Sequence, residues 1–208
     1  MKVFSGIQPT GQIHIGNYLG AVKYWHLLQE KHDCYFTVVD LHALTVQQDA
    51  KEFSKVILSK VVELLSVGID PERCVLFLQS HVREHTELAW IFNTLTPISE
   101  LERMTQFKDK SAKNVKNINV GLLTYPVLQA ADILLYKPQG VPVGKDQVQH
   151  IELSREIARK FNTRYGELFP EPQHLLSNAP RIMGLDGKNK MSKSMNNYIS
   201  LIEEPDAI

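Results

Sequence analysis

Cysteines, long hydrophobic runs and a targeting segment are scarce or missing in this sequence of 208 residues. The two cysteines, Cys34 and Cys74, stand too far apart to form a zinc-ligand pair, and both lie in apolar runs. We therefore expect buried free thiols rather than a disulfide framework, which fits a reducing compartment. No segment is apolar for long enough to span a membrane, and residues 1–6 lack the apolar stretch of a signal peptide. These absences predict a soluble, cytoplasmic protein without a membrane partner.

An excess of one charge sign is also missing, since 23 lysines and arginines are balanced by 23 aspartates and glutamates. This balance argues against a protein whose whole surface binds nucleic acid, but it leaves room for a local basic patch. The sequence shows no internal repeat and no low-complexity segment. Its length suffices for one large α/β domain or two small ones, with a substantial hydrophobic core.

Short apolar runs rich in β-branched and aromatic residues alternate with segments of helical periodicity. The expected strands are 3–7, 34–39, 75–78, 141–143 and 181–183. The expected helices are 16–31, 53–65, 85–95, 98–107, 122–135 and 148–161, with loops at 108–119 and over most of 162–189. Such an alternation predicts an α/β fold with a doubly wound parallel sheet and helices on both faces. Ligands of such sheets bind at the carboxyl ends of the strands.

A turn-forming segment with candidate phosphate-binding groups follows the first expected strand. It runs from Pro9 to Asn17, with the sequence PTGQIHIGN, and leads into the first expected helix. Gly16 permits close approach of the backbone, and the N–H groups at a helix start favour an anion. The side chains of His14 and Asn17 add donors that could reach phosphate oxygens. An ordinary turn with a helix cap remains the alternative.

A second candidate segment, KMSKS, lies near the other end of the chain at Lys190–Ser194, with Gly184 and Gly187 upstream. Two lysines and two hydroxyl groups within five residues suit a polyphosphate that must be bound and then released. Because short basic runs are common, composition alone favours a solvated basic loop.

Together, the two segments resemble the paired signatures of the class I aminoacyl-tRNA synthetases. The first is similar to the HIGH motif, here as HIGN, and the second matches KMSKS at every position. Further strings resemble bacterial-type tryptophanyl-tRNA synthetases over essentially the whole chain. They begin at Phe4 (FSGIQPTG), Gly16 (GNYLGA), Val39 (VDLHALT), Glu100 (ELERMTQFKDKS), Tyr125 (YPVLQAADILLY), Val141 (VPVGKDQVQHIELSREIA) and Arg181 (RIMGLDG).

This resemblance implies a domain organisation. A Rossmann-like catalytic domain would cover residues 1–200, with a helical insertion at about 80–122 that also carries the contacts of a homodimer. Residues 201–208 would begin a helical anticodon-binding domain, which is truncated in this sequence.

The candidate residue for recognising tryptophan is Asp132. The indole N–H of tryptophan can only donate a hydrogen bond, so its pocket needs an acceptor. Asp132 lies in the apolar segment 122–135, where an unpaired carboxylate is costly and a ligand N–H would relieve the cost. Pairing with a basic side chain or a helix N-terminus is the alternative that the residues leave open.

The resemblance implies that Asp132 binds the indole within a larger tryptophan site. The residues of that site are Phe4, Gly6, His42, Tyr125, Gln129, Asp132, Val141, Val143 and Gln147. Gln129 departs from the family pattern, because many members have methionine at this position.

The resemblance also implies an ATP site that combines both signatures with residues 144–146. Its residues are Gln8, Pro9, Thr10, His14, Gly16, Asn17, Gly144, Lys145, Asp146, Ile182, Lys190, Met191, Ser192, Lys193 and Ser194. The implied catalytic residues are Asn17, Lys110, Lys190 and Lys193. Lys145 stands where the family usually has glutamate, but this motif acts partly through its backbone. Mg²⁺ would bind through the ATP phosphates, with no metal held by protein side chains.

The implied activity is that of a tryptophan–tRNA ligase. Such an enzyme forms tryptophanyl-adenylate from L-tryptophan and ATP, transfers tryptophan to tRNA(Trp), and releases AMP and diphosphate. A tyrosyl-tRNA synthetase is the nearest alternative, because Tyr125, Gln129 and Asp132 also occur in that family. Phe4 on the first strand favours tryptophan, since tyrosine would need a polar partner there. A second alternative is a truncated or non-charging paralogue that only binds ATP and an amino acid.

Overall fold

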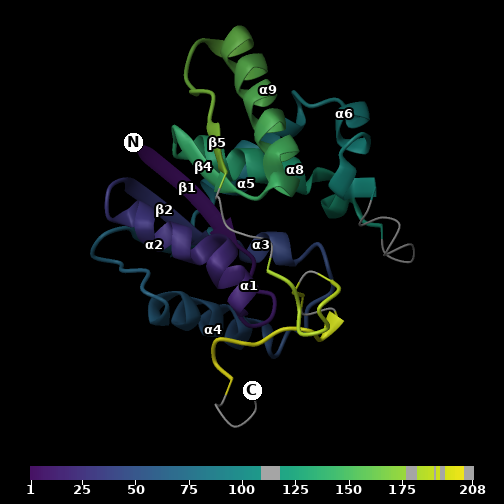
Figure 1. Cartoon of the computed structure of the whole chain (residues 1–208). Helices are drawn as coiled ribbons and strands as arrows, with labels where there is room; N and C mark the ends of the chain where they lie inside the picture. The colour runs from purple at the N-terminus through teal and green to yellow at the C-terminus, as the bar shows by residue number, and fades with distance from the viewer. Residues whose placement is uncertain (109–117, 177–181, 190, 193–194, 204–208) are drawn as a thin grey trace.

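Five parallel strands form the centre of the molecule (Figure 1). The computed structural model describes residues 1–108, 118–176, 182–189, 191–192 and 195–203. The strands are β1 (Lys2–Ile7), β2 (Asp33–Val38), β3 (Val75–Leu78), β4 (Gly140–Val143) and β5 (Gln173–Leu176). They lie in the order β3-β2-β1-β4-β5, and every neighbouring pair is parallel. The chain starts at the centre, builds one side and then crosses to the other, which confirms the predicted doubly wound α/β fold.

Helices connect these strands. They are α1 (Ile15–Asn17), η1 (Tyr18–Val22), α2 (Lys23–Gln29), α3 (Asp40–Ala43), α4 (Phe53–Ser66), η2 (Gln79–His81), α5 (Glu84–Asn93), α6 (Ile98–Glu102), α8 (Val120–Leu135), η3 (Lys145–Gln147) and α9 (Val148–Tyr165). The first expected helix is thus formed by α1, η1 and α2, with η1 as a π-helical segment inside it. Helix α9 continues four residues beyond its expected end, to Tyr165.

The helices cover both faces of the sheet (Figure 1). Successive residues of a strand point to opposite faces, so Val3 and Phe4 belong to different parts of the core. Val3 packs in a cluster with Trp25, Phe36 and Leu64, on the side of α2 and α4. Phe4 packs with Ile133, Val141 and Ile151, on the side of α8 and α9. A third cluster joins α5, α6, α8 and α9 through residues that include Phe92, Leu101, Leu134 and Ile157.

The fifth strand does not lie where the sequence predicted it. β5 is formed by residues 173–176, whereas Ile182 and Met183 form no strand and Arg181 lies outside the described residues. β5 is a short edge strand that pairs with β4 alone among the described strands. Its sequence, QHLL, contains only two apolar residues, which is too little for a periodic pattern to stand out.

The helix expected at 98–107 is interrupted after one turn. α6 ends at Glu102, where the backbone N–H of Met104 bonds to the carbonyl of Leu101, three residues back, at 3.1 Å. Residues 105–108 are helical again. The expected loop at 108–119 lies mostly outside the described residues, which exclude 109–117.

Both cysteines are buried free thiols, as predicted. Burial raises the pKa of the Cys34 thiol to about 12 and also raises the pKa of Cys74. Neither group forms a reactive thiolate at neutral pH, so they act as small apolar residues of the core.

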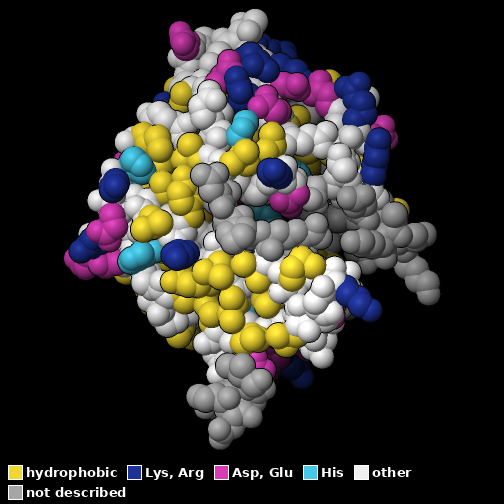
Figure 2. All heavy atoms as spheres, in the orientation of Figure 1, with side chains coloured by type: hydrophobic (Ala, Val, Ile, Leu, Met, Phe, Trp, Pro, Cys, Tyr) yellow, Lys and Arg dark blue, Asp and Glu magenta, His cyan; other side chains and the backbone are white. Residues whose placement is uncertain are grey.

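The surface carries apolar side chains but no membrane segment within the described residues, where every helix is too short or too polar to cross a bilayer. Figure 2 shows hydrophobic atoms gathered over the region of α2 and α4. Exposed large hydrophobic residues of these two helices are Leu27, Leu58, Val62 and Leu65.

Candidate functional site

A crevice opens where the two central strands β1 and β4 diverge. They pair at one register position, Val3 with Gly140, whereas β1 pairs with β2 from Lys2 to Ile7. Toward the carboxyl ends, the Ser5 hydroxyl donates to the Pro142 carbonyl at 3.3 Å. Connections leave this point toward both edges of the sheet, so it is the topological switch point at which such folds bind ligands.

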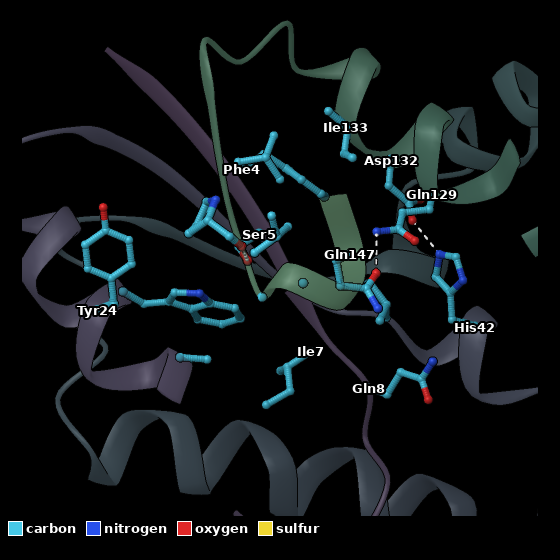
Figure 3. A pocket seen from close by; sticks show the side chains of 18 of the residues that line it. Phe4, Ser5, Ile7, Gln8, Tyr24, His42, Gln129, Asp132, Ile133 and Gln147 are labelled. Atoms are coloured by element: carbon cyan, nitrogen blue, oxygen red, sulfur yellow. Dashed lines mark hydrogen bonds and ion pairs between the residues drawn. The ribbon is translucent and has the colours of Figure 1, made fainter. Parts of the chain in front are cut away.

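A cavity of about 340 Å³ occupies this crevice (Figure 3). Its size is typical of a site for a small molecule. All residues of the predicted tryptophan site line it, namely Phe4, Gly6, His42, Tyr125, Gln129, Asp132, Val141, Val143 and Gln147. Gln8 and Gly144 of the predicted ATP site line it as well. The structure therefore gathers side chains from β1, α3, α8 and β4 that are far apart in the sequence.

Much of the cavity wall is apolar. Phe4 and Val141 are buried beside Ile133 in one cluster, and the Phe4 ring stacks on Tyr136 with centroids 5.3 Å apart. The other end is lined by Tyr24 together with Trp25, Gly20 and Ala21. Gly20 and Ala21 belong to the π-helix η1, a kind of helical irregularity that is frequent at functional sites.

Asp132 is the polar centre of the end of the cavity that lies away from Tyr24 (Figure 3). It is 1% exposed, and three protein groups donate to its carboxylate. Oδ2 accepts from Nε2 of His42 at 2.6 Å, and Oδ1 accepts from Nε2 of Gln79 at 2.8 Å and from Nδ1 of His85 at 2.7 Å. His42 lines the cavity with Asp132 (Figure 3), whereas Gln79 and His85 are not among its lining residues. The alternative of pairing with basic side chains is thus realised, although Asp132 still faces the cavity.

These contacts keep Asp132 ionised. Burial alone would raise the pKa of its carboxyl group, but the charge and hydrogen bond of His42, followed by those of His85, outweigh it. The pKa of Asp132 therefore lies below its ordinary value. The cavity holds a carboxylate with no proton to donate, which can act only as an acceptor.

Neutral polar groups line the cavity elsewhere. The Tyr125 hydroxyl lies 3.1 Å from Nε2 of His150, and burial raises the pKa of Tyr125 to about 12, so this hydroxyl is protonated at neutral pH. Nε2 of Gln129 donates to Oε1 of Gln147 at 3.3 Å (Figure 3). Gln129 is therefore a cavity residue despite its departure from the family pattern.

The HIGN segment forms a helix cap. The backbone N–H of Asn17 donates to Nδ1 of His14 at 3.2 Å, and the N–H of His14 donates to Oδ1 of Asn17 at 3.3 Å. This reciprocal pair is a capping box at the start of α1. The ordinary capping function proposed as the alternative is therefore present in this segment.

A buried ion pair fixes the loop that precedes this cap. Lys60 and Glu63 of α4 have side chains that are 2% and 5% exposed, and Nζ of Lys60 lies 2.8 Å from Oε2 of Glu63. Lys60 also donates to the carbonyl of Gly11 at 2.6 Å, and the same Glu63 oxygen accepts from the N–H of Ile13 at 2.6 Å. Helix α4 thus anchors the loop through both of its charged side chains.

The two signature segments lie against each other. A Cβ atom placed on Gly16 would lie 3.4 Å from Cβ of Met191, so the HIGN and KMSKS segments lie close together at this point. Nearby, the N–H of Ile15 bonds to the carbonyl of Ile199 at 3.0 Å, and the N–H of Leu201 bonds to the carbonyl of Ile13 at 2.9 Å. These two hydrogen bonds join the chain beyond KMSKS to the start of α1 and to the loop before it.

Side chains near the KMSKS segment organise its described part. Asp186 accepts hydrogen bonds from the N–H groups of Asn189 and Lys188, which hold the pKa of its carboxyl group well below the ordinary value. Asn197 donates to Asp186 at 3.0 Å and accepts from the N–H of Ser192 at 2.8 Å. Ser192 is therefore held by a hydrogen-bonded loop of polar residues.

The remaining residues of the predicted ATP site are only partly placed. Those that are described but do not line the cavity are Pro9, Thr10, His14, Gly16, Asn17, Lys145, Asp146, Ile182, Met191 and Ser192. Lys110, Lys190, Lys193 and Ser194 lie outside the described residues. Among the residues that are described, no group of three or more His, Cys, Asp and Glu side chains could hold a metal ion.

Two polar residues of this site were not predicted from the sequence. Gln79 and His85 are fully buried and contact Asp132, which lies 53 and 47 positions away in the sequence. Gln79 follows directly on β3. Its place at the carboxyl end of a strand was the available signal, because such positions converge on the ligand crevice.

Comparison with known proteins gives consistent results in sequence and structure. A family model described as class I tRNA synthetases (W and Y) matches residues 1–208. The tryptophan–tRNA ligase of Gloeobacter violaceus is 55% identical over 208 residues, covering 99% of this chain and 62% of that protein. The corresponding ligase of Caldanaerobacter subterraneus subsp. tengcongensis is 53% identical over 213 residues, covering 100% and 64%.

The fold is also similar to that of a protein whose crystal structure is known. That structure, tryptophanyl-tRNA synthetase from Campylobacter jejuni complexed with ADP and tryptophan, superposes with a TM-score of 0.95 at 43% identity. The match covers 100% of this chain and 65% of that one, so this chain spans less than two thirds of its relatives' lengths. The family model matches the whole chain, and the similar proteins agree with it. The chain therefore belongs to the class I tRNA synthetases of the tryptophan and tyrosine group.

Proposed function

We propose that the cavity binds L-tryptophan and that the protein activates it with ATP for transfer to tRNA(Trp). The observation that carries this proposal is the ionised Asp132 at an end of the cavity walled by Phe4 and Val141. An indole needs flat apolar walls and one acceptor for its N–H, and this end of the cavity offers both.

Tyrosine fits the same end less well. A phenol hydroxyl both donates and accepts, so a tyrosine site needs a donor beside the carboxylate. Phe4, the β1 residue that packs with Val141 in the cavity wall, has no polar atom in its side chain. The names of the curated relatives at 53–55% identity also support tryptophan.

The polar part of the amino acid would lie toward the neutral groups of the cavity. Tyr125, Gln129 and Gln147 line it and can hydrogen-bond to an ammonium and a carboxylate group. ATP would lie beside the polar part of the amino acid, along Gln8, Gly144 and the HIGN segment. The proximity of Gly16 and Met191 supports a single nucleotide site formed by both signatures, and the C. jejuni structure with ADP and tryptophan supports the same pair of ligands.

Activation needs no base from the protein. The carboxylate oxygen of tryptophan attacks the α-phosphorus of ATP, the bond to the bridging oxygen breaks, and pyrophosphate leaves with its electrons. Catalysis then consists of positioning the two substrates and stabilising the charge that develops on the phosphates. Lys110, Lys190 and Lys193 are the proposed cations, with Asn17 beside the nucleotide. The 2′-hydroxyl of the terminal adenosine of tRNA then attacks the adenylate and releases AMP.

Three further parts of the sequence-based prediction belong to this proposal. Mg²⁺ would enter bound to the phosphates of ATP and neutralise part of their charge. A homodimer would form through the region of residues 80–122. A cytoplasmic location fits the reaction, because ribosomes use the charged tRNA there.

Amino-acid-dependent exchange of pyrophosphate into ATP tests the proposal. We expect exchange with tryptophan and much slower exchange with tyrosine, measured on the same preparation. Preference for tyrosine would establish the alternative substrate, and exchange with neither amino acid would contradict the proposed activation. Charging of tRNA(Trp), measured in parallel, separates a complete ligase from a protein that only activates the amino acid.

A further inference from the structure

The two oxygens of Asp132 are in different situations. Oδ1 accepts two hydrogen bonds, from Gln79 at 2.8 Å and from His85 at 2.7 Å. Oδ2 accepts one, from His42 at 2.6 Å. A carboxylate offers about four acceptor positions, two on each oxygen. Among the described residues, the protein thus fills Oδ1 and leaves one position on Oδ2.

Both donors to Oδ1 are themselves held in place. The amide oxygen of Gln79 accepts from the N–H of Leu41 at 3.1 Å, so its NH₂ group must face Asp132. Because a carboxylate can only accept, Nδ1 of His85 carries a proton. The other ring nitrogen of His85 lies 2.9 Å from the hydroxyl of Tyr136.

The same network continues to the apolar wall of the cavity. Tyr136 stacks on Phe4, with an angle of 11° between the ring planes, and Phe4 lines the cavity. His85 also lies against the Phe77 ring, with centroids 6.0 Å apart. His85 therefore joins the carboxylate that would accept the ligand N–H to the ring that would pack on the ligand.

We infer that Gln79 and His85 are positioning residues that give the cavity its preference for a bicyclic ring with an N–H donor. By occupying Oδ1, they prevent rotation of the carboxylate and direct the remaining position on Oδ2 toward the ligand. The inference rests on the proposed binding of tryptophan. It assigns a role in that binding to two residues that do not line the cavity.

The test compares two bicyclic ligands of similar shape. Tryptophan has the indole N–H, whereas β-(3-benzothienyl)alanine has sulfur in its place and no donor. Binding of each to the full chain is measured by calorimetry, and the ratio of the two dissociation constants reports recognition of the N–H. A hydrogen bond to a charged acceptor corresponds to a preference of roughly 10- to 100-fold for tryptophan in the unaltered protein.

Two variants remove the donors, and one restores a donor. His85→Phe and Gln79→Met each keep much of the side-chain volume but cannot donate to Oδ1. We expect the preference for tryptophan to fall several-fold in both, with little change in the affinity for the benzothienyl compound. His85→Asn places an amide N–H near the position of Nδ1, so it should keep most of the preference. A role confined to folding would weaken both ligands together and leave their ratio unchanged.

His26→Asn is the matched control, because the His26 ring bonds to the Gly68 carbonyl at 2.8 Å and does not line this cavity. The preference should be unchanged in this variant. Unaltered preference in folded His85→Phe and Gln79→Met would overturn the inference; if His85→Phe does not fold, Gln79→Met decides it. Failure of the proposed function looks different, since the unaltered protein itself would then show no preference for tryptophan.

Discussion

Gln79 and His85 both donate to Oδ1 of Asp132. This arrangement determines how an asparagine at position 132 would be oriented. In Asp132→Asn, the amide oxygen must face Gln79 and His85, because an NH₂ group there would meet two donors. The amide nitrogen then faces the cavity, where the acceptor for the indole N–H was.

We therefore predict that Asp132→Asn weakens tryptophan binding by roughly 10- to 100-fold. The benzothienyl analogue, which makes no such hydrogen bond, should bind with nearly the same affinity as before. Calorimetry with both ligands checks the prediction. Equal losses for the two ligands would show that the substitution collapses the cavity rather than removing one acceptor.

The ionisation of Asp132 also makes stability depend on pH. Histidines from α3 and α5 face its carboxylate, and they hold its pKa below the ordinary value despite burial. A group with a lowered pKa in the folded state adds stability that is fully present above the pKa of the unfolded chain, about 4 for aspartate. That stability is lost as the pH falls through the lower, folded value.

The predicted outcome is a free energy of unfolding that declines below about pH 4. Urea unfolding at a series of pH values measures it. Asp186 contributes in the same direction, since its pKa is also lowered, so the informative comparison is with Asp132→Asn. That variant should show a shallower decline, and an identical decline would contradict the assignment to Asp132.

At the scale of elements, the sequence was informative wherever a residue pattern was long or strongly apolar. β1, β2, β3, α4 and α8 lie where their patterns predicted them. β5 was missed, because an edge strand of four residues has little apolar periodicity. The π-helix η1 was also missed, since its sequence, YLGAV, is compatible with an ordinary helical turn.

Helix α4 illustrates a signal that was visible but not used. Lys60 falls on the apolar face of the periodic pattern that predicted this helix, where a solvated lysine is out of place. The structure shows the reason, because Lys60 and Glu63 turn inward to fix the loop at Gly11 and Ile13. A charged residue in phase with apolar ones thus indicated a buried contact, but its partner could not be read from the sequence.

We predict that Glu63→Leu lowers the free energy of unfolding by about 3–5 kcal/mol, because it leaves the buried Lys60 without its carboxylate. The double variant Lys60→Met/Glu63→Leu should lose less than Glu63→Leu alone, since it removes the unpaired charge. Urea unfolding of all three variants, with Lys60→Met included, completes the double-mutant cycle.

The exposed pair of Glu52 and Lys55 on the same segment is the control. Glu52→Ala should change the unfolding free energy by less than about 1 kcal/mol, as is usual for solvent-exposed ion pairs. If Glu63→Leu were as mild as Glu52→Ala, the buried pair would not be an anchor of the loop.

For the whole molecule, the sequence predicted which segments converge but not how they touch. The crevice followed from strand alternation, and the candidate cavity residues followed from family resemblance. The pairing of Asp132 with Gln79 and His85 could not be predicted, because it joins three different elements whose relative placement depends on packing of the entire core. The contact of α3 with α8 through His42 and Asp132 is of the same kind.

Dimer formation is a property of the whole molecule. In the region predicted to form a dimer, Trp90 is 72% exposed, and Ile98 and Val120 are exposed as well. Exposed aromatic and aliphatic residues of this size are typical of a surface covered by a partner. We predict that Trp90→Glu converts a dimer to a monomer in sedimentation velocity.

Leu58→Glu is the control for this prediction, because Leu58 is an exposed apolar residue of α4, outside that region. It should leave the sedimentation coefficient unchanged. A monomeric unaltered protein, or a Trp90→Glu variant that remains dimeric, would exclude this interface.

The divergence of β1 and β4 has a consequence for the backbone itself. With a single register position between them, the central strands share few of the ladder hydrogen bonds that β1 shares with β2. An amino acid bound across the gap would touch both strands and restrain β4 on the side that faces β1, where the two strands pair at one register position only. The amide protons of β4 and β5 should then exchange with deuterium more slowly, so that occupancy by substrate could be followed at β5, which does not line the cavity.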